Sequence, residues 1–303
     1  MRRTLLVLLL LLVAVFMFEQ CAFAGAWTVP KDHVWAEWYQ KWNWAKYDYT
    51  PENHLDKKVR DGRSWGWSFE PKIEYGAYDW LNFLMSIVEY KQQYYKEYDR
   101  PRGPGNDWGD YKRKNHGVTA VRLGGKIRIT DKPAVVSFQT KVDLNPGYGR
   151  NHGDDLAFRE NPSLGDGETG IEMRGLIGKE FHLPFGWKNK QIKCYAGAES
   201  GYRINAHSEL ANQVPFFFEG GFWLTKHHLI KTELDGRWSH DQTGSIEKEW
   251  AIWRIGCLWA VLGGDPVAKQ GKQFNVEFQY GLWAWGRNVS ADQELIIKLQ
   301  TEF

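Results

Sequence analysis

The chain has 303 residues, a formal net charge of +2 and 16% aromatic residues, among them 17 tryptophans. A charge so close to zero gives no electrostatic basis for binding nucleic acid or another strongly charged partner. The length permits one large domain or two ordinary ones, and since no Pro/Gly/Ser linker divides the chain, we expect a single domain.

The first 24 residues have the pattern of a secretory signal peptide. Arg2 and Arg3 precede the apolar run 5–18, and Ala22 and Ala24 supply small residues at the two positions that a signal peptidase reads. A retained transmembrane helix is the alternative, but this run of 14 residues is short of the roughly 20 needed to cross a bilayer. We therefore expect residues 1–24 to be removed and residues 25–303 to form the mature domain.

Apolar and charged residues alternate along most of residues 25–303. In residues 118–130, for example, Leu123 and Ile127 fall on one face, and Arg122 and Lys126 on the other. Successive side chains of a strand point to opposite faces, so a period of two indicates strands, whereas a helix would scatter the charges. About twelve segments show this pattern, the third and the tenth less regularly, so the expected number is twelve plus or minus two: 33–42, 65–75, 81–94, 118–130, 134–144, 171–180, 191–199, 214–224, 228–238, 249–261, 273–284 and 293–303.

The links between these expected strands alternate in length, most clearly in the first half. Tight turns fall at 76–80, 131–133 and 225–227, whereas long polar links fall at 49–64, 96–116 and 145–170. An outer-membrane barrel has short periplasmic turns and longer outside loops.

Two all-β folds remain to be compared, a soluble sandwich and a closed membrane barrel. A soluble sandwich also alternates, but it seldom places charges in tight rows opposite the apolar face of nearly every strand. In lipid an open sheet is excluded, because each unpaired backbone group in hydrocarbon costs several kcal/mol. We predict an all-β protein: a transmembrane antiparallel up-and-down β-barrel of about twelve strands in the outer membrane, closed by pairing of the last strand with the first.

Aromatic residues fall near the ends of many expected strands, as in the two interface girdles of a membrane barrel. We predict membrane-interface positions for Trp42, Trp65, Trp67, Trp238, Trp250, Trp285 and Phe303.

The signal, the strand ladder and the terminal aromatic strand resemble Gram-negative bacterial outer-membrane β-barrel proteins. The start Gly-Ala-Trp-Thr-Val-Pro at residues 25–30 is similar to the XagA-like group, related to transporters of the phenol-degradation outer-membrane type. The resemblance implies contact with outer-membrane lipid and lipopolysaccharide, insertion by the barrel assembly machinery through the terminal strand, and a transport role. It carries over no catalytic residue.

If the apolar faces meet lipid, the alternate faces line the interior. Twelve strands lie between filled eight-stranded barrels and open porins, so the lumen is either a narrow wet channel or a space plugged by ion pairs. Four basic residues on adjacent strands, Arg122, Lys126, Arg128 and Lys141, form a group that favours anionic solutes. The predicted pore-lining residues are Arg122, Lys126, Arg128, Lys141, Glu172, Arg174, Lys193, Glu199, Lys231, Glu233, Asp235, Arg237 and Glu277.

We predict a porin-like channel, not an enzyme, through which small polar solutes diffuse passively, with anions favoured. The alternative is a non-conducting accessory barrel of a surface or export complex, whose links 96–116 and 145–170 bind a partner; a homo-oligomer also stays open. A hydrolase is less favoured, because the neighbours His207 and Ser208 would point to opposite faces of a strand. No metal or cofactor site is expected, because the histidines and acidic links lack the required spacing.

Overall fold

A computed structural model describes residues 25–58, 61–101, 108–145, 164, 169–184, 191–206, 210–240, 247–263, 267 and 271–303, apart from the side chains of 98–101 and 108–111. Among these residues, no helix is both long and apolar enough to cross a membrane. The predicted signal peptide and residues 207–209, which include His207 and Ser208, lie outside the described residues.

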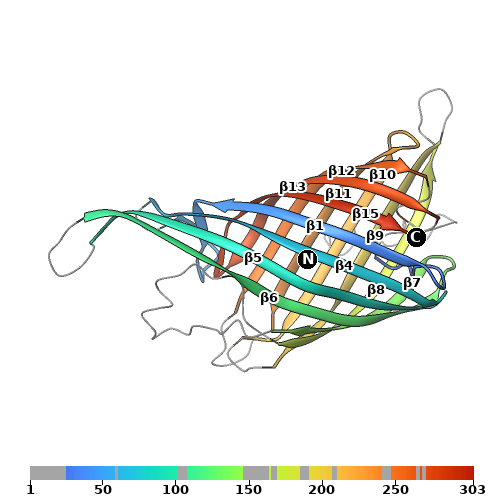
Figure 1. The fold of residues 1–303 in the computed structure, drawn as a ribbon, viewed down its shortest axis with the longest axis horizontal. Coiled ribbons are helices and arrows are strands. Elements are labelled where there is room, and N and C mark those ends of the chain that lie inside the picture. The colour runs from blue at the N-terminus through green and yellow to red at the C-terminus, as the bar shows by residue number, and fades with distance from the viewer. Residues whose placement is uncertain are drawn as a thin grey trace, which may run out of the picture.

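Within the described residues, twelve long strands form one closed antiparallel barrel (Figure 1). In chain order they are β1 (Val34–Ala45), β4 (Arg63–Tyr78), β5 (Leu81–Pro101), β6 (Trp108–Thr130), β7 (Val135–Leu144), β8 (Gly170–Leu183), β9 (Ile192–Asn205), β10 (Gln213–Trp223), β11 (His228–Ser239), β12 (Glu249–Leu262), β13 (Gln273–Arg287) and β15 (Gln293–Glu302). Each strand pairs with its neighbours in this order, and each of the twelve expected segments corresponds to one of them. The predicted fold class and strand number are confirmed.

The barrel closes where the two ends of the mature domain meet. Strand β1 pairs with β15 from Trp35↔Glu302 to Trp44↔Gln293. The pairing extends one residue further, since the Val34 amide donates to the Phe303 carbonyl at 2.9 Å and the Phe303 amide donates to the Val34 carbonyl at 3.1 Å. The last strand therefore leaves no open edge, which a sheet in lipid cannot tolerate.

The outer surface of the barrel is apolar and its inner surface is charged. On β12, Ile255 is 50% exposed on the outside, whereas its neighbour Arg254 is 8% exposed and faces inward. The same contrast separates Phe278, at 50%, from Glu277, at 0%, on β13. A band of large exposed hydrophobic side chains around the wall is stable in hydrocarbon and would aggregate in water. The protein is an integral outer-membrane barrel, as expected.

The two ends of the barrel differ. The connections 79–80, 131–134 and 224–227 are short and lie at one end, the turn end, together with Phe303 and the residues that precede β1 (Figure 1). The opposite end, the loop end, carries the two longest connections, between β1 and β4 and between β7 and β8. A three-stranded sheet lies there, formed by β2 (Tyr47–Tyr49), β3 (Leu55–Lys57) and β14 (Val289–Ser290).

The prediction of a long loop at 96–116 is wrong in part. Strand β5 continues to Pro101 and β6 begins at Trp108, so most of this range is a paired hairpin that projects beyond the other strands (Figure 1). A strand that has left the bilayer has no lipid-facing side, so its residues need not alternate between apolar and charged. Most of the second predicted loop, 146–163 and 165–168, lies outside the described residues.

Candidate functional site

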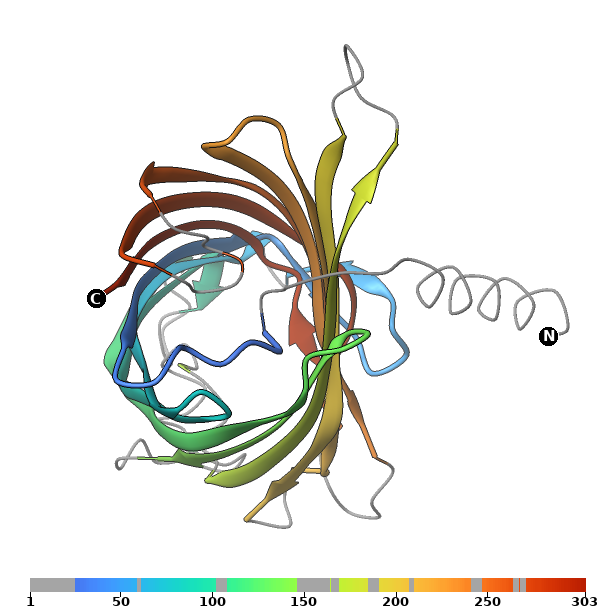
Figure 2. The same cartoon turned by 90° about the vertical axis from the view of Figure 1, so that its right-hand side faces the viewer.

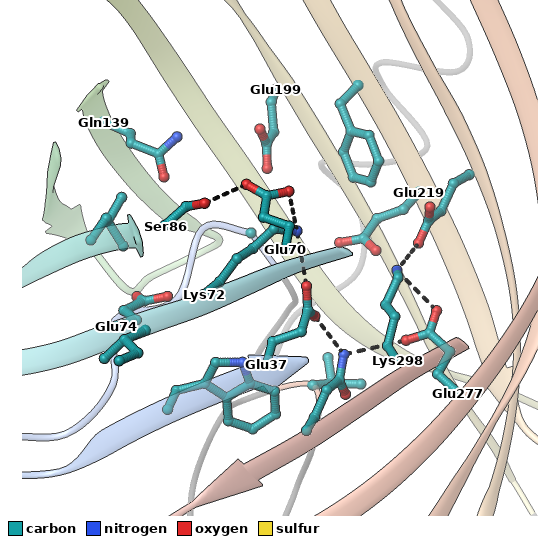
Figure 3. A pocket seen from close by; sticks show the side chains of 18 of the residues that line it. Glu37, Glu70, Lys72, Glu74, Ser86, Gln139, Glu199, Glu219, Glu277 and Lys298 are labelled. Atoms are coloured by element: carbon teal, nitrogen blue, oxygen red, sulfur yellow. Dashed lines mark hydrogen bonds and ion pairs between the residues drawn. The ribbon is translucent and has the colours of Figure 1, made fainter. Parts of the chain in front are cut away.

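The interior of the barrel contains two cavities, one above the other along its axis. The outer cavity, toward the loop end, has a volume of about 540 Å³ and is lined by residues such as Tyr39, Glu172 and Trp283. The inner cavity, toward the turn end, has a volume of about 350 Å³ and is lined by residues such as Glu37 and Glu199 (Figure 3). Seven residues border both cavities and form a waist between them: Glu70, Lys72, Arg122, Lys141, Phe217, Glu233 and Lys298.

Ten of the thirteen residues predicted to line a pore border these cavities. They are Arg122, Lys141, Glu172, Arg174, Glu199, Lys231, Glu233, Asp235, Arg237 and Glu277. The other three, Lys126, Arg128 and Lys193, lie closer to the turn end; Lys193 pairs with Glu180 at 2.8 Å. These inward positions could be predicted from the alternation, because side chains that alternate with a lipid-facing row must point into the barrel.

One wall of the waist is held by ion pairs between neighbouring strands. The guanidinium of Arg122 on β6 lies 2.5 Å from Glu70 on β4, 2.6 Å from Glu89 on β5 and 3.3 Å from Asp143 on β7. Removing charges from bulk water is costly unless each charge finds partners. Three carboxylates around one guanidinium satisfy this condition and keep the side chain against the wall.

The facing wall carries a second network. Lys231 lies 2.7 Å from Glu233, 3.1 Å from Glu277 and 3.7 Å from Glu219. Lys298 on β15 reaches the same Glu277 at 3.2 Å and Glu233 at 3.4 Å. The two networks brace opposite walls, so ion pairing narrows the lumen but leaves both cavities in place.

The outer cavity has an excess of cationic groups on one side. The carboxylate of Glu172 is shared by Arg174 at 2.7 Å, Arg237 at 3.3 Å and Lys141 at 3.9 Å. Among the described residues, eight cationic side chains and six carboxylates line this cavity. Arg174 also pairs with Glu199 at 3.1 Å. Three cations on two carboxylates leave positive charge that an anion in the cavity would neutralise.

The charge balance reverses in the inner cavity. Among the described residues, seven carboxylates line it, against five cationic side chains. Figure 3 shows several of these carboxylates pointing into one space, with Glu199 and Glu219 on the far wall from Glu37 and Glu70. The described lining therefore changes from an excess of cationic groups to an excess of carboxylates on passing the waist, and two of these carboxylates, Glu74 and Glu199, pair with Lys126 and Arg174.

The residues that precede β1 lie inside the turn end of the lumen. Ala26, Trp27, Thr28 and Val29 are at most 3% exposed. Figure 2 looks onto this end and shows the segment, in blue, running across the opening. Ala26 and Trp27 pack in an apolar cluster with Val135, Leu176, Tyr195, Leu229, Leu258, Ala260 and Val267. We call residues 25–30 the N-terminal plug.

Polar contacts fix the start of the N-terminal plug to the wall. The ammonium group of Lys126 donates to the Gly25 carbonyl at 3.2 Å and pairs with Glu74 at 2.5 Å. The hydroxyl of Ser137 donates to the Ala26 carbonyl. The sequence offers one sign of this role, since an uncharged, partly apolar stretch outside any strand must be buried somewhere, but it does not say where.

The predicted interface aromatics lie on the outer surface, with one exception. Trp42, Trp65, Trp238 and Phe303 are exposed and Trp67 and Trp285 are half-buried. Trp250 was wrongly predicted at the interface: it lines the outer cavity, with its ring 5.7 Å from that of Trp283. Trp250 points inward because it lies four residues from Arg254 on β12, and residues an even number apart on a strand share one face. The interface role of the others stays a prediction.

Among the described residues, no group of three or more His, Cys, Asp or Glu side chains could hold a metal ion. The hydrolase alternative depends on Ser208, which the structure does not describe.

Comparisons with known proteins support the fold. No family model matches the chain, and no curated protein matches it. The structure is similar to that of the COG4313 outer membrane channel from Pseudomonas putida F1, with a TM-score of 0.58 and 13% identity, over 94% of this chain and 100% of that one. The fold is that of an outer-membrane barrel.

Two further solved structures are more distant. The translocator domain of autotransporter NalP from Neisseria meningitidis gives a TM-score of 0.40 at 10% identity, over 89% of this chain and 88% of that one. A Pseudomonas aeruginosa FadL homologue gives a TM-score of 0.36 at 8% identity, over 94% and 99%. At these scores neither adds to the argument.

Proposed function

We propose that the protein is an outer-membrane channel through which small polar solutes diffuse, with anions preferred. The observation that carries this proposal is the pair of adjacent cavities, about 540 and 350 Å³, which share the seven lining residues of the charged waist. A barrel whose interior is filled with side chains would lack such space. The size and polarity of the cavities suit small hydrated solutes.

The preference for anions rests on the outer cavity, which a solute from outside meets first. Lys141, Arg174 and Arg237 share the carboxylate of Glu172 there. A positive potential at the mouth of a channel raises the local concentration of anions and lowers that of cations.

The N-terminal plug makes this a gated channel. Trp27 is buried among wall side chains at the turn end, and we expect conduction to require the plug to leave this site. We therefore expect wild-type channels that are mostly closed and open briefly.

Single-channel recording in planar bilayers tests the proposal. We expect rare openings for the wild type and frequent openings when residues 26–29 are replaced by Gly and Ser. A folded barrel that shows no resolvable current with either form contradicts the proposal.

Several finer assignments belong to the same proposal. The pore-lining role of the ten cavity residues, the absence of enzymatic activity and of a cofactor, membership of the XagA-like group, and insertion by the barrel assembly machinery through β15 all stay predictions. Lipid and lipopolysaccharide are the expected surroundings of the apolar band.

The β5–β6 hairpin favours a second candidate, an accessory barrel of a surface or export complex. Residues 108–120 of β6 pair with β5 alone, because β7 pairs only from Val121 to Thr130. Paired strands that extend past the barrel wall are a surface suited to a protein partner. Co-purification of a partner that is lost when residues 97–112 are shortened, with no current from either form, would favour this candidate over the channel.

A further inference from the structure

We propose that signal cleavage after Ala24 creates a cation that the lumen is built to receive: the α-amino group of Gly25 pairs with Glu199 and fastens the N-terminal plug. This inference does not depend on conduction. It depends on the predicted cleavage site and on the geometry around Gly25.

Gly25 lies inside the barrel, where it lines the inner cavity. Its carbonyl oxygen accepts a hydrogen bond from Lys126 at 3.2 Å, so its position against the wall is fixed. Its φ angle is +78°, a conformation that glycine adopts without strain and other residues rarely adopt. The residue expected to start the mature chain is thus held at one defined place in the lumen.

Glu199 on β9 lies directly beside Gly25. A Cβ atom on Gly25 would be 2.6 Å from the Glu199 Oε1 atom, so the carboxylate would have to move to admit a side chain there. With standard backbone bond lengths, the Gly25 nitrogen is then within roughly 5 Å of this oxygen. Only a small rotation of a free terminus separates the two atoms from ion-pair distance.

The two oxygens of Glu199 differ in their partners. Oε2 accepts from Arg174 at 3.1 Å. Among the described residues, no donor lies within hydrogen-bonding distance of Oε1, the oxygen that faces Gly25, although the carboxylate is only 14% exposed. A sheltered carboxylate oxygen has a strong preference for a cationic donor.

The described lining of the inner cavity carries seven carboxylates and five cationic side chains. Two of these carboxylates pair with cations from outside the lining, Glu74 with Lys126 at 2.5 Å and Glu199 with Arg174 at 3.1 Å. An ammonium group at Gly25 would therefore give Glu199 a second cationic partner in a confined space, where charges need several partners.

Hydrolysis of the Ala24–Gly25 bond consumes one water and leaves a carboxylate on Ala24 and an amino group on Gly25. An α-amino group has an ordinary pKa near 8, so it is mostly protonated at neutral pH. In the precursor the same nitrogen is a neutral amide. The ion pair therefore forms only after processing, and the plug is fastened only in the mature protein.

The experiment starts from mature protein purified from outer membranes. Its intact mass identifies the first residue, which we expect to be Gly25. Acetylation with a membrane-impermeant amine reagent at neutral pH then measures how accessible the α-amino group is, by mass spectrometry of the N-terminal peptide.

We expect the α-amino group of the folded wild type to react at least tenfold more slowly than in the unfolded chain, and Glu199→Gln to remove most of this protection. Glu70→Gln is the matched control, because it deletes a carboxylate from the same cavity at a distance from Gly25, and it should retain the protection. Migration of unheated samples in gels confirms that each barrel is folded.

A second variant keeps Glu199 and its bond to Arg174 and moves the amine instead. One alanine inserted between Ala24 and Gly25 shifts the amino group by one residue, and protection should again fall. A mature chain that starts elsewhere, or equal labelling rates in the wild type, the Glu199→Gln variant and the extended variant, would overturn the inference.

Discussion

Truncation of Trp27 should open the channel without unfolding the barrel. Trp27 is 3% exposed and packs with wall residues such as Leu176 and Tyr195, so Trp27→Ala removes the largest apolar contact of the N-terminal plug. Truncating a buried tryptophan to alanine costs about 3–5 kcal/mol. At roughly 1.4 kcal/mol for each factor of ten, the docked fraction of the plug should fall relative to the undocked fraction by about a hundredfold to a few thousandfold.

The barrel itself should survive, because its twelve strands remain paired all around. The assay is the open probability of single channels in planar bilayers. Trp42→Ala is the control, since Trp42 lies on the outer surface near the loop end, and it should leave the open probability unchanged. A folded Trp27→Ala protein with the same open probability as the wild type would refute the assignment of residues 25–30 as the element that closes the lumen.

Three other substitutions test separate parts of the account. Lys141→Glu adds a carboxylate near Glu172 and should lower the permeability of anions relative to cations, read from the reversal potential in a KCl gradient; an unchanged ratio contradicts the anion preference. Glu277→Gln removes a fully buried partner of Lys231 and should destabilise the barrel by about 3–5 kcal/mol, seen as a lower thermal midpoint in detergent; an unchanged midpoint contradicts the role of the wall networks. Ile255→Arg near the middle of β12 should cost about 2–4 kcal/mol in equilibrium unfolding from lipid vesicles, and no cost would show that position 255 lies outside hydrocarbon.

The sequence predicts those parts of the barrel that lie between lipid and lumen. There, physical chemistry imposes a period of two, and the alternation on β6 or β11 gives both the strand and the direction of each side chain. Closure is also predictable, because hydrocarbon does not tolerate the open edge that a terminal strand such as β15 would otherwise leave.

The parts that the sequence does not predict are those where no such pattern is imposed. The outer ends of β5 and β6 have left the bilayer, and β2 pairs with β14, with Tyr49 opposite Val289, far away in the chain. Alternation likewise shows that Arg122 faces inward, but its partners come from three different strands. The N-terminal plug has no strand pattern, and its site is formed by residues scattered over the barrel wall.

We propose above all that the lumen conducts and that the N-terminal plug closes it. A disulfide between Ala26→Cys and Ser137→Cys tests this most directly, because the Ser137 hydroxyl already donates to the Ala26 carbonyl. Cys194 and Cys257, the free cysteines among the described residues, are first replaced by alanine.

Intact mass shows whether the bond has formed. We predict no current through the oxidised protein and a return of wild-type openings after reduction in the same bilayer. Equal conductance in the oxidised and reduced states would contradict the claim.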